Sequence, residues 1–226
     1  MTLVLHGYWR SGTSYRTRIA LNLKKLDYEI RPVNLLAGEQ AGTSYRDIDP
    51  QGLVPTLQTP DGALIQSPAI LEWLEETHPE LPLLPSDPRG RAQVRAMAAV
   101  IGCDVHPLNN LRVLRSLRRD LGASEEHLAA WQARWIDDGF SALEVLIARH
   151  GRGFAWGEQP TFADCYLVPQ VYAAERFGID LAPYPLIREV TERCLALDAF
   201  AAAHPDRQPD APSPGGENAT RPTSGR

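Results

Sequence analysis

The stretch WRSGTSYRTRIAL, residues 9–21, follows the first apolar run of the chain and reads as a strand-to-helix junction. The junction carries one cation, Arg10, and three hydroxyls, those of Ser11, Thr13 and Ser14. A helix N-terminus exposes unpaired N–H donors and a partial positive charge, so it favours anions, thiolates included. One hydroxyl is enough to cap a helix. The pattern therefore predicts either a cap alone or a cap combined with a site for an anion.

Outward from this junction, the first 80 residues alternate between strand and helix patterns. We expect strands at 2–8, 28–36, 53–59 and 63–66, and helices at 13–25 and from residue 67. A helix between two strands predicts a parallel pair, and the Pro-Asp-Gly turn at 60–62 predicts an antiparallel hairpin. Residues 1–80 are therefore expected to form an α/β domain.

The rest of the chain is helical in pattern. Four prolines in PELPLLPSDP (79–88) cannot continue a helix, and we place an interdomain linker at 81–88. An all-helical domain is expected at 89–204, with helices over 89–119, 124–150, from a Thr161–Asp164 capping box onward, and over 185–200. Almost no apolar residues follow, so residues 205–226 are predicted to be a disordered tail.

The composition argues against several classes of protein, among them nucleic-acid-binding, membrane-spanning and secreted proteins. The chain has 226 residues and a net charge of −5, which gives no general basic character for nucleic acid. No apolar run is long enough for a membrane span, and the N-terminus lacks the pattern of a signal peptide. Three scattered cysteines indicate reduced thiols in a cytoplasmic protein. Cys103 and His106 lack a second pair of ligands, so we predict no metal site.

Two further dipeptides stand out in the first domain. Val54-Pro55 interrupts an expected strand, and it indicates either a cis bond or a strand start that leaves the Val54 backbone free for a peptide-like ligand. The plainer alternative is an edge-strand proline. Gln66-Ser67 opens a helix, where Ser67 is expected either to act as a cap alone or to cap and also hold a carboxylate at the helix N-terminus.

In this order, the motifs resemble those of the glutathione transferases, and the resemblance covers about residues 3–205. The segments WRSGTSYRTRIALNLK, QSPAILEWLEE, GCDVHPLNN and TFADCYLVPQ are most similar to the zeta class. The resemblance implies a thioredoxin-like N-terminal domain followed by the helical transferase domain. One departure is Thr13, where many zeta enzymes carry cysteine, with Gly12 before it where serine is frequent. A protein thiol is therefore not expected to act at this site.

The resemblance also implies a glutathione site. The thiol would meet Ser11 and Thr13, with either hydroxyl as its donor, and the cysteinyl backbone would pair with Val54. Other glutathione contacts are implied for Gln51, Gln66, Ser67, His106 and Asn110.

The reaction implied by the resemblance is glutathione-dependent cis–trans isomerisation of a maleyl keto acid, maleylacetoacetate or maleylpyruvate, in aromatic catabolism. Such a substrate is a dianion, and arginine binds carboxylates with both arms of its planar fork. Arg10, beside the expected thiolate, and Arg112 and Arg176 are the candidate clamps. The alternative for each of them is a solvated surface charge.

Two other functions compete with the isomerase. One is a transferase that conjugates or dehalogenates small electrophiles, which does not require carboxylate clamps. The other is a non-enzymatic binding module, which predicts a degraded thiolate motif. The resemblance further implies a homodimer with the helical domains near its axis.

Overall fold

The computed structural model describes residues 2–212. A four-stranded sheet has the order β2-β1-β3-β4, with bounds Leu3–Gly7 for β1, Tyr28–Pro32 for β2, Thr56–Thr59 for β3 and Gly62–Ile65 for β4. Strand β1 pairs parallel to β2 and antiparallel to β3, and β3 and β4 form a hairpin. Both predicted strand pairings are confirmed.

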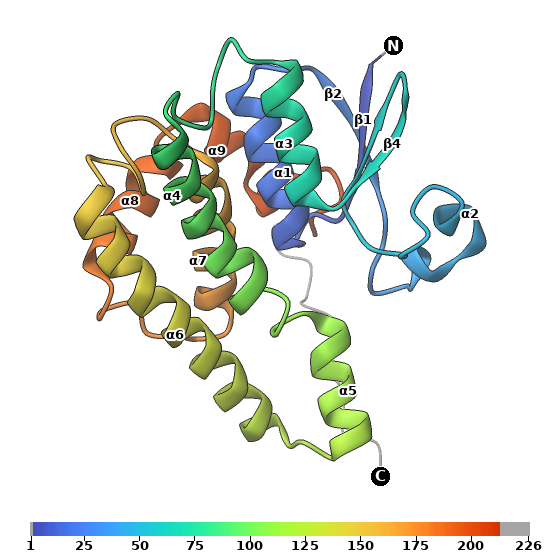
Figure 1. Cartoon of the computed structure of the whole chain (residues 1–226). Helices are drawn as coiled ribbons and strands as arrows, with labels where there is room; N and C mark the ends of the chain where they lie inside the picture. Colours follow the sequence, from blue (N-terminus) through green and yellow to red (C-terminus); the bar gives the residue numbers. More distant parts are fainter. Residues whose placement is uncertain (1, 213–226) are drawn as a thin grey trace.

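Two helices cover one face of this sheet, α1 (Gly12–Leu23) and α3 (Ser67–Thr77), as Figure 1 shows. The short α2 (Thr43–Arg46) lies apart from them. Leu5, Ile19, Leu57 and Ile70, contributed by two strands and two helices, are at most 1% exposed. Burial of such aliphatic side chains stabilises the layer by about 25 cal/mol per Å² of apolar surface removed from water.

The second part of the chain is helical. Its elements are α4 (Pro88–Ala99), a π-helix (Val100–Val105), α5 (Leu111–Leu121), α6 (Glu125–His150), α7 (Phe162–Arg176), α8 (Pro185–Leu195) and α9 (Asp198–Ala203). The predicted start of α6 is confirmed, because the Ser124 side chain accepts from His127 N–H.

Two segments that were each predicted as one continuous helix are interrupted in the structure. The expected helix over 89–119 ends after the π-helix, and α5 begins only at Leu111. Pro107 explains the break, because proline has no N–H and its ring clashes with the preceding helical turn. The expected helix over 185–200 is interrupted between Leu195 and Asp198, where Leu197 takes an extended backbone.

The capping box at the start of α7 is confirmed. The buried Asp164 carboxylate accepts from Thr161 N–H at 2.7 Å, from the Thr161 hydroxyl at 3.0 Å and from Ala155 N–H at 2.8 Å. Burial raises the pKa of Asp164 to about 6, and these hydrogen bonds oppose that shift. The group fixes the start of α7, the helix that forms one wall of the cleft described below.

Helix α1 is common to both parts of the chain. One side of it packs on α3, and another packs on α7 and α9. Its polar side chains also reach the second part: Arg18 Nε donates to Ala203 O at 2.9 Å, and Asn22 Nδ2 donates to Ala199 O at 2.9 Å. The position of α1 is therefore set from two directions.

A buried ion pair secures the linker. Lys24 Nζ lies 2.8 Å from Glu75 Oε2, and their side chains are 0% and 5% exposed. The Glu75 carboxylate also accepts from Leu83 N–H at 2.9 Å and from Leu84 N–H at 3.1 Å. Lys24 donates in addition to two carbonyls at the end of α3 and just beyond it, those of residues 78 and 81. One carboxylate thus joins α1, α3 and the linker.

The prediction of a disordered tail is wrong for residues 205–212. Pro205–Arg207 form a 3₁₀ turn, and Gln208 Nε2 donates to Ala202 O at 3.0 Å and to His204 O at 2.8 Å. Local prolines and polar residues do not prevent folding here, because the neighbouring helices supply the hydrogen-bond partners. We call residues 204–212 the C-terminal strap. The remainder of the predicted tail, 213–226, lies outside the described residues.

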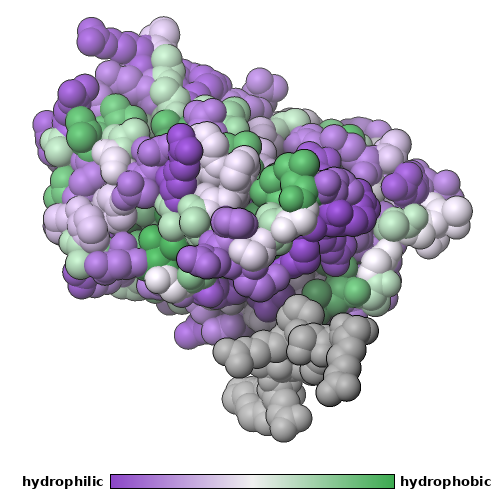
Figure 2. Space-filling model, turned by 90° about the horizontal axis from the view of Figure 1, so that it is seen from below, coloured by the Kyte–Doolittle hydropathy of each residue, from purple (hydrophilic) through white to green (hydrophobic). Residues whose placement is uncertain are grey.

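On the face shown in Figure 2, hydrophobic residues occur in small groups among hydrophilic ones. The large hydrophobic side chains that are exposed include Leu111 and Leu121 of α5 and Val145 of α6. Within residues 2–212, no helix is long and apolar enough to cross a membrane.

Candidate active site

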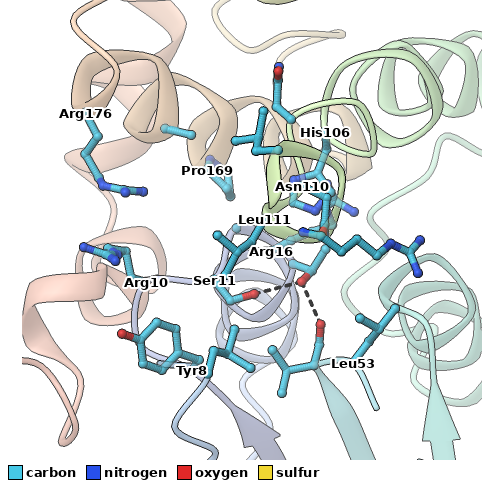
Figure 3. A pocket seen from close by; sticks show the side chains of 18 of the residues that line it. Tyr8, Arg10, Ser11, Arg16, Leu53, His106, Asn110, Leu111, Pro169 and Arg176 are labelled. Atoms are coloured by element: carbon cyan, nitrogen blue, oxygen red, sulfur yellow. Dashed lines mark hydrogen bonds between the residues drawn. The ribbon is translucent and has the colours of Figure 1, made fainter. Parts of the chain in front are cut away.

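A cleft of about 300 Å³ lies where the N-terminus of α1 meets α5 and α7. Figure 3 shows Ser11 within it, with Arg10 and Arg176 to one side and His106 and Asn110 to the other. The cleft is lined by eight of the predicted site residues: Arg10, Ser11, Thr13, Val54, His106, Asn110, Arg112 and Arg176. The structure thus brings together residues that are up to 166 positions apart in the sequence, from Arg10 to Arg176.

The two candidate hydroxyls, those of Ser11 and Thr13, have different hydrogen-bond partners. Ser11 is the N-cap of α1, and its Oγ accepts from Ser14 N–H at 3.3 Å. Thr13 Oγ1 donates to Val54 O at 2.9 Å, which uses its only proton. The Ser11 and Thr13 oxygens are 2.9 Å apart, so Ser11 is the donor between them. Only the Ser11 proton can be redirected to an anion without breaking a bond to the backbone.

The Val54-Pro55 peptide is cis, and β3 starts directly after it at Thr56, so both structural expectations for this dipeptide are confirmed. The Val54 backbone was also expected to be free, and this holds for its N–H group but not for its carbonyl. Val54 O is taken by Thr13, whereas Val54 N–H has no partner among residues 2–212. A peptide-like ligand could therefore accept from this N–H.

Two guanidinium groups face one side of the cleft. The Arg10 guanidinium lies 5.3 Å from the centre of the Trp9 ring, and the Arg176 guanidinium lies 5.8 and 5.6 Å from the centres of the Tyr172 and Phe177 rings. Loss of solvent, and then the positive charge of Arg10, lower the pKa of Arg176. Neither arginine has an acidic partner among residues 2–212. Two neighbouring cations without a counter-ion form a site for a carboxylate.

Arg16 is a cleft residue that the motif analysis did not identify. It is 2% exposed, its Nη1 donates to Ser67 Oγ at 3.0 Å, and its guanidinium lies 3.5 Å from the centre of the Tyr166 ring. Its Nε has no hydrogen-bond partner among residues 2–212, and burial lowers the pKa of the guanidinium. A buried, incompletely paired cation favours a bound anion. Its spacing from Thr13, one helical turn, was the signal that could have found it.

The far wall of the cleft comes from the break between α4 and α5. A Cβ on Gly12 would lie 3.7 Å from the His106 ring, so the π-helix ends against the start of α1. Burial, and then the charge of Arg16, lower the pKa of His106 to about 3, and the imidazole is neutral at pH 7. Asn110 caps α5 by accepting from Arg112 N–H at 3.1 Å, which leaves its amide N–H₂ to donate.

Three predicted glutathione contacts do not line the cleft. The Gln66 amide donates to the Gln51 side chain, and Gln66 has a φ of 67°, uncommon for a residue other than glycine. Ser67 is 2% exposed and bonded to Arg16. The expectation that Ser67 caps α3 is wrong: Ser67 is its first residue, Gln66 occupies the cap position, and no side chain caps it.

The sequence and the fold are similar to those of known proteins. A model described as the N-terminal domain of glutathione S-transferases matches residues 10–77, and the corresponding C-terminal domain model matches residues 123–198. The maleylpyruvate isomerase of a Ralstonia species is 53% identical over 209 residues, which are 91% of this chain and 98% of that one. The chain belongs to the glutathione S-transferase family.

Solved structures agree with this assignment. The holo structure of a maleylpyruvate isomerase, described as a zeta-class bacterial glutathione S-transferase, is 52% identical with a TM-score of 0.90, and covers 92% of this chain and 100% of that one. A maleylacetoacetate isomerase of Anaeromyxobacter dehalogenans 2CP-1, solved with glutathione in its active site, is 49% identical with a TM-score of 0.85 and covers 93% and 98%. The resemblance to the zeta class is confirmed, and so is the transferase fold.

Proposed function

We propose that this transferase-family protein is a glutathione-dependent isomerase of a maleyl keto acid, maleylpyruvate or maleylacetoacetate. The observation that carries the proposal is the pair Arg10 and Arg176, two cations beside the Ser11 hydroxyl in one cleft, neither with an acidic partner in the described part of the chain. A conjugating transferase for neutral electrophiles does not require such a pair. Relatives of both names, each about half identical to this chain, support the same reaction.

The residues present fit glutathione. Val54 N–H is available to a peptide-like ligand, and the buried Arg16 guanidinium is incompletely paired. Glutathione supplies a thiolate whose reversible addition turns the maleyl double bond into a single bond that can rotate. We assign contacts with it to four cleft residues, Val54, Arg16, His106 and Asn110. Gln51, Gln66 and Ser67, which do not line the cleft, stay predicted contacts.

We assign the thiolate contact to Ser11. A free thiol has a pKa near 8.5, so the enzyme must stabilise the anion at neutral pH. Ser11 has the hydroxyl proton that can be redirected, and it sits at the positive end of α1. Thr13 has a supporting role, because its hydroxyl fixes the Val54 carbonyl and accepts from Ser11 while the site is free.

The arginines bind the substrate. Arg10 and Arg176 take one carboxylate, and Arg112, at the start of α5, takes the other end of the dianion. A carboxylate held by two guanidinium groups is fixed in position and direction, which orients the double bond toward Ser11. The same positive field stabilises negative charge that develops on the substrate oxygens.

The proposal is tested with freshly prepared maleylpyruvate and maleylacetoacetate, each with and without glutathione. Turnover is expected only with glutathione, and the ratio of the two kcat/KM values ranks the substrates. Turnover of neither acid by a protein that still binds glutathione would favour the conjugating or dehalogenating transferase.

The arginine pair gives a second test. Replacing Arg176 with methionine is expected to raise KM for the maleyl acid by about tenfold, since a charge-assisted hydrogen bond contributes about 1.5–3 kcal/mol. The KM for glutathione should stay within about twofold. An equal rise in both KM values would contradict a clamp for the substrate carboxylate.

We further propose residues 1–80 as the glutathione-binding domain and 89–204 as the substrate domain of a cytoplasmic homodimer. The three free cysteines fit a reducing compartment. The exposed Leu121 and Val145 offer apolar surface to a second copy. A monomer mass in sedimentation equilibrium at micromolar concentration would reject the dimer.

A further inference from the structure

The segment that carries Arg10 is a tight turn. Ser11 N–H donates to Tyr8 O at 3.0 Å, which closes a β-turn with Trp9 and Arg10 as its two central residues. The hydrogen bonds that a turn makes within itself leave the N–H of the first central residue unpaired. The orientation of Arg10 therefore depends on what holds the Trp9 peptide groups.

Both peptide groups of Trp9 are held, and one partner is remote in sequence. Trp9 N–H donates to Asp210 Oδ2 at 2.9 Å, across 201 residues. Trp9 O accepts from Arg18 Nη2 at 3.0 Å, and the same guanidinium donates through Nε to Ala203 O at 2.9 Å. The C-terminal strap and the end of α9 thus fix this turn on its two sides.

The same strap also supports the second arginine of the pair. The His204 ring meets the Tyr172 ring edge-on with centroids 5.4 Å apart. Tyr172 lines the cleft, and Arg176 lies over its ring at 5.8 Å. The strap itself is held to α9 by the hydrogen bond from Gln208 to Ala202 O, and the bond from Gln208 to His204 O closes it internally. Two of its contacts therefore lead to the two cations on one side of the cleft.

We infer that Asp210 is a positioning residue for carboxylate binding: by holding Trp9 N–H, it sets the direction of Arg10 toward Arg176. His204 supports Arg176 in the same way through Tyr172. The strap is thus part of the substrate site although it does not line the cleft. This inference rests on the proposed function, because it assigns the two arginines to a substrate carboxylate.

The test compares Asp210→Ala with Asp210→Asn. The alanine variant is expected to raise KM for the better maleyl acid about fivefold, with kcat and the KM for glutathione within about twofold. The asparagine variant is expected to recover most of the loss, because its amide oxygen still accepts from Trp9 N–H. His204→Ala is a second, independent variant with the same expected pattern. Asp198→Ala, an exposed carboxylate in α9, is the matched control and should be silent.

Amide hydrogen exchange supplies a readout besides activity. In Asp210→Ala, the Trp9 amide is expected to exchange at least about tenfold faster, while the amides of β1 keep their rates. Unchanged Trp9 exchange, or a KM for glutathione that rises as much as the KM for the maleyl acid, would overturn the inference. If the unaltered protein isomerises neither acid, the proposed function fails, and exchange at Trp9 still decides whether Asp210 holds the turn.

Discussion

Replacing Ser11 with alanine is expected to lower kcat/KM for the maleyl acid by about 100-fold, the size of effect seen when one donor to a developing anion is removed. Of the Ser11 and Thr13 hydroxyls, the variant loses the one whose proton can turn to the thiolate without releasing a backbone carbonyl. Removing a donor to the anion also raises the pKa of the bound thiol. The pH profile of kcat/KM should therefore shift to higher pH by about one unit or more.

Thr13→Val is the matched control, since it removes the neighbouring hydroxyl at nearly constant volume. Its expected loss is about tenfold smaller, because Thr13 acts through Ser11 and Val54 and does not donate to the thiolate. A larger effect for Thr13→Val than for Ser11→Ala would exchange the two assignments. Equal thiol pKa values in both variants and in the unaltered protein would remove the hydroxyls from the mechanism.

Replacing Glu75 with leucine is expected to lower the free energy of unfolding by about 3–5 kcal/mol, the cost typical of a buried ion pair that loses one partner. The Lys24 ammonium would be left without an anion, and the N–H groups of Leu83 and Leu84 would lose their acceptor. Denaturant unfolding measures the change. Lys24→Met should cost less, because Glu75 would keep two backbone donors.

The pair Arg95 and Glu72 provides the comparison for this prediction. Its two hydrogen bonds, 2.7 and 2.8 Å long, are as short as the buried one, but the side chains are 41% and 35% exposed. Glu72→Leu is expected to change the free energy of unfolding by less than about 1 kcal/mol. Similar decreases in the free energy of unfolding for Glu72→Leu and Glu75→Leu would show that burial does not determine how much each ion pair stabilises the protein.

The sequence predicted elements whose signals are local. The alternating strands, the Thr161–Asp164 box and the start of the helix over 124–150 each depend on residues a few positions apart, and all are found. The break before α5 was missed, although Pro107 is visible in the sequence, because proline is also compatible with a kinked helix. The role of Ser67 was misassigned because a serine at a helix start is usually a cap, and here it serves Arg16.

The site residues of the strand-to-helix junction were predictable because they are neighbours in the sequence. Residues whose roles depend on tertiary contacts were not predictable. Arg16 was missed because an arginine is expected at the surface, whereas α7 covers this one with the Tyr166 ring. Asp210 was missed because its partner is 201 residues away and the surrounding composition predicts disorder. The contact between Asp210 and Trp9 leaves no spacing signal along the chain, whereas Arg16 at least lies one helical turn from Thr13.

The sharing of α1 between the two parts of the chain has a consequence for how the protein can be divided. A protease cut in the proline-rich linker would divide the chain into two fragments, neither of which would be stably folded on its own. The N-terminal piece would expose the side of α1 where Tyr15 meets Tyr172, and the C-terminal piece would lose α1, against which α7 and α9 pack. The linker is thus a boundary in the sequence, while the cooperative folding unit extends from β1 to the strap.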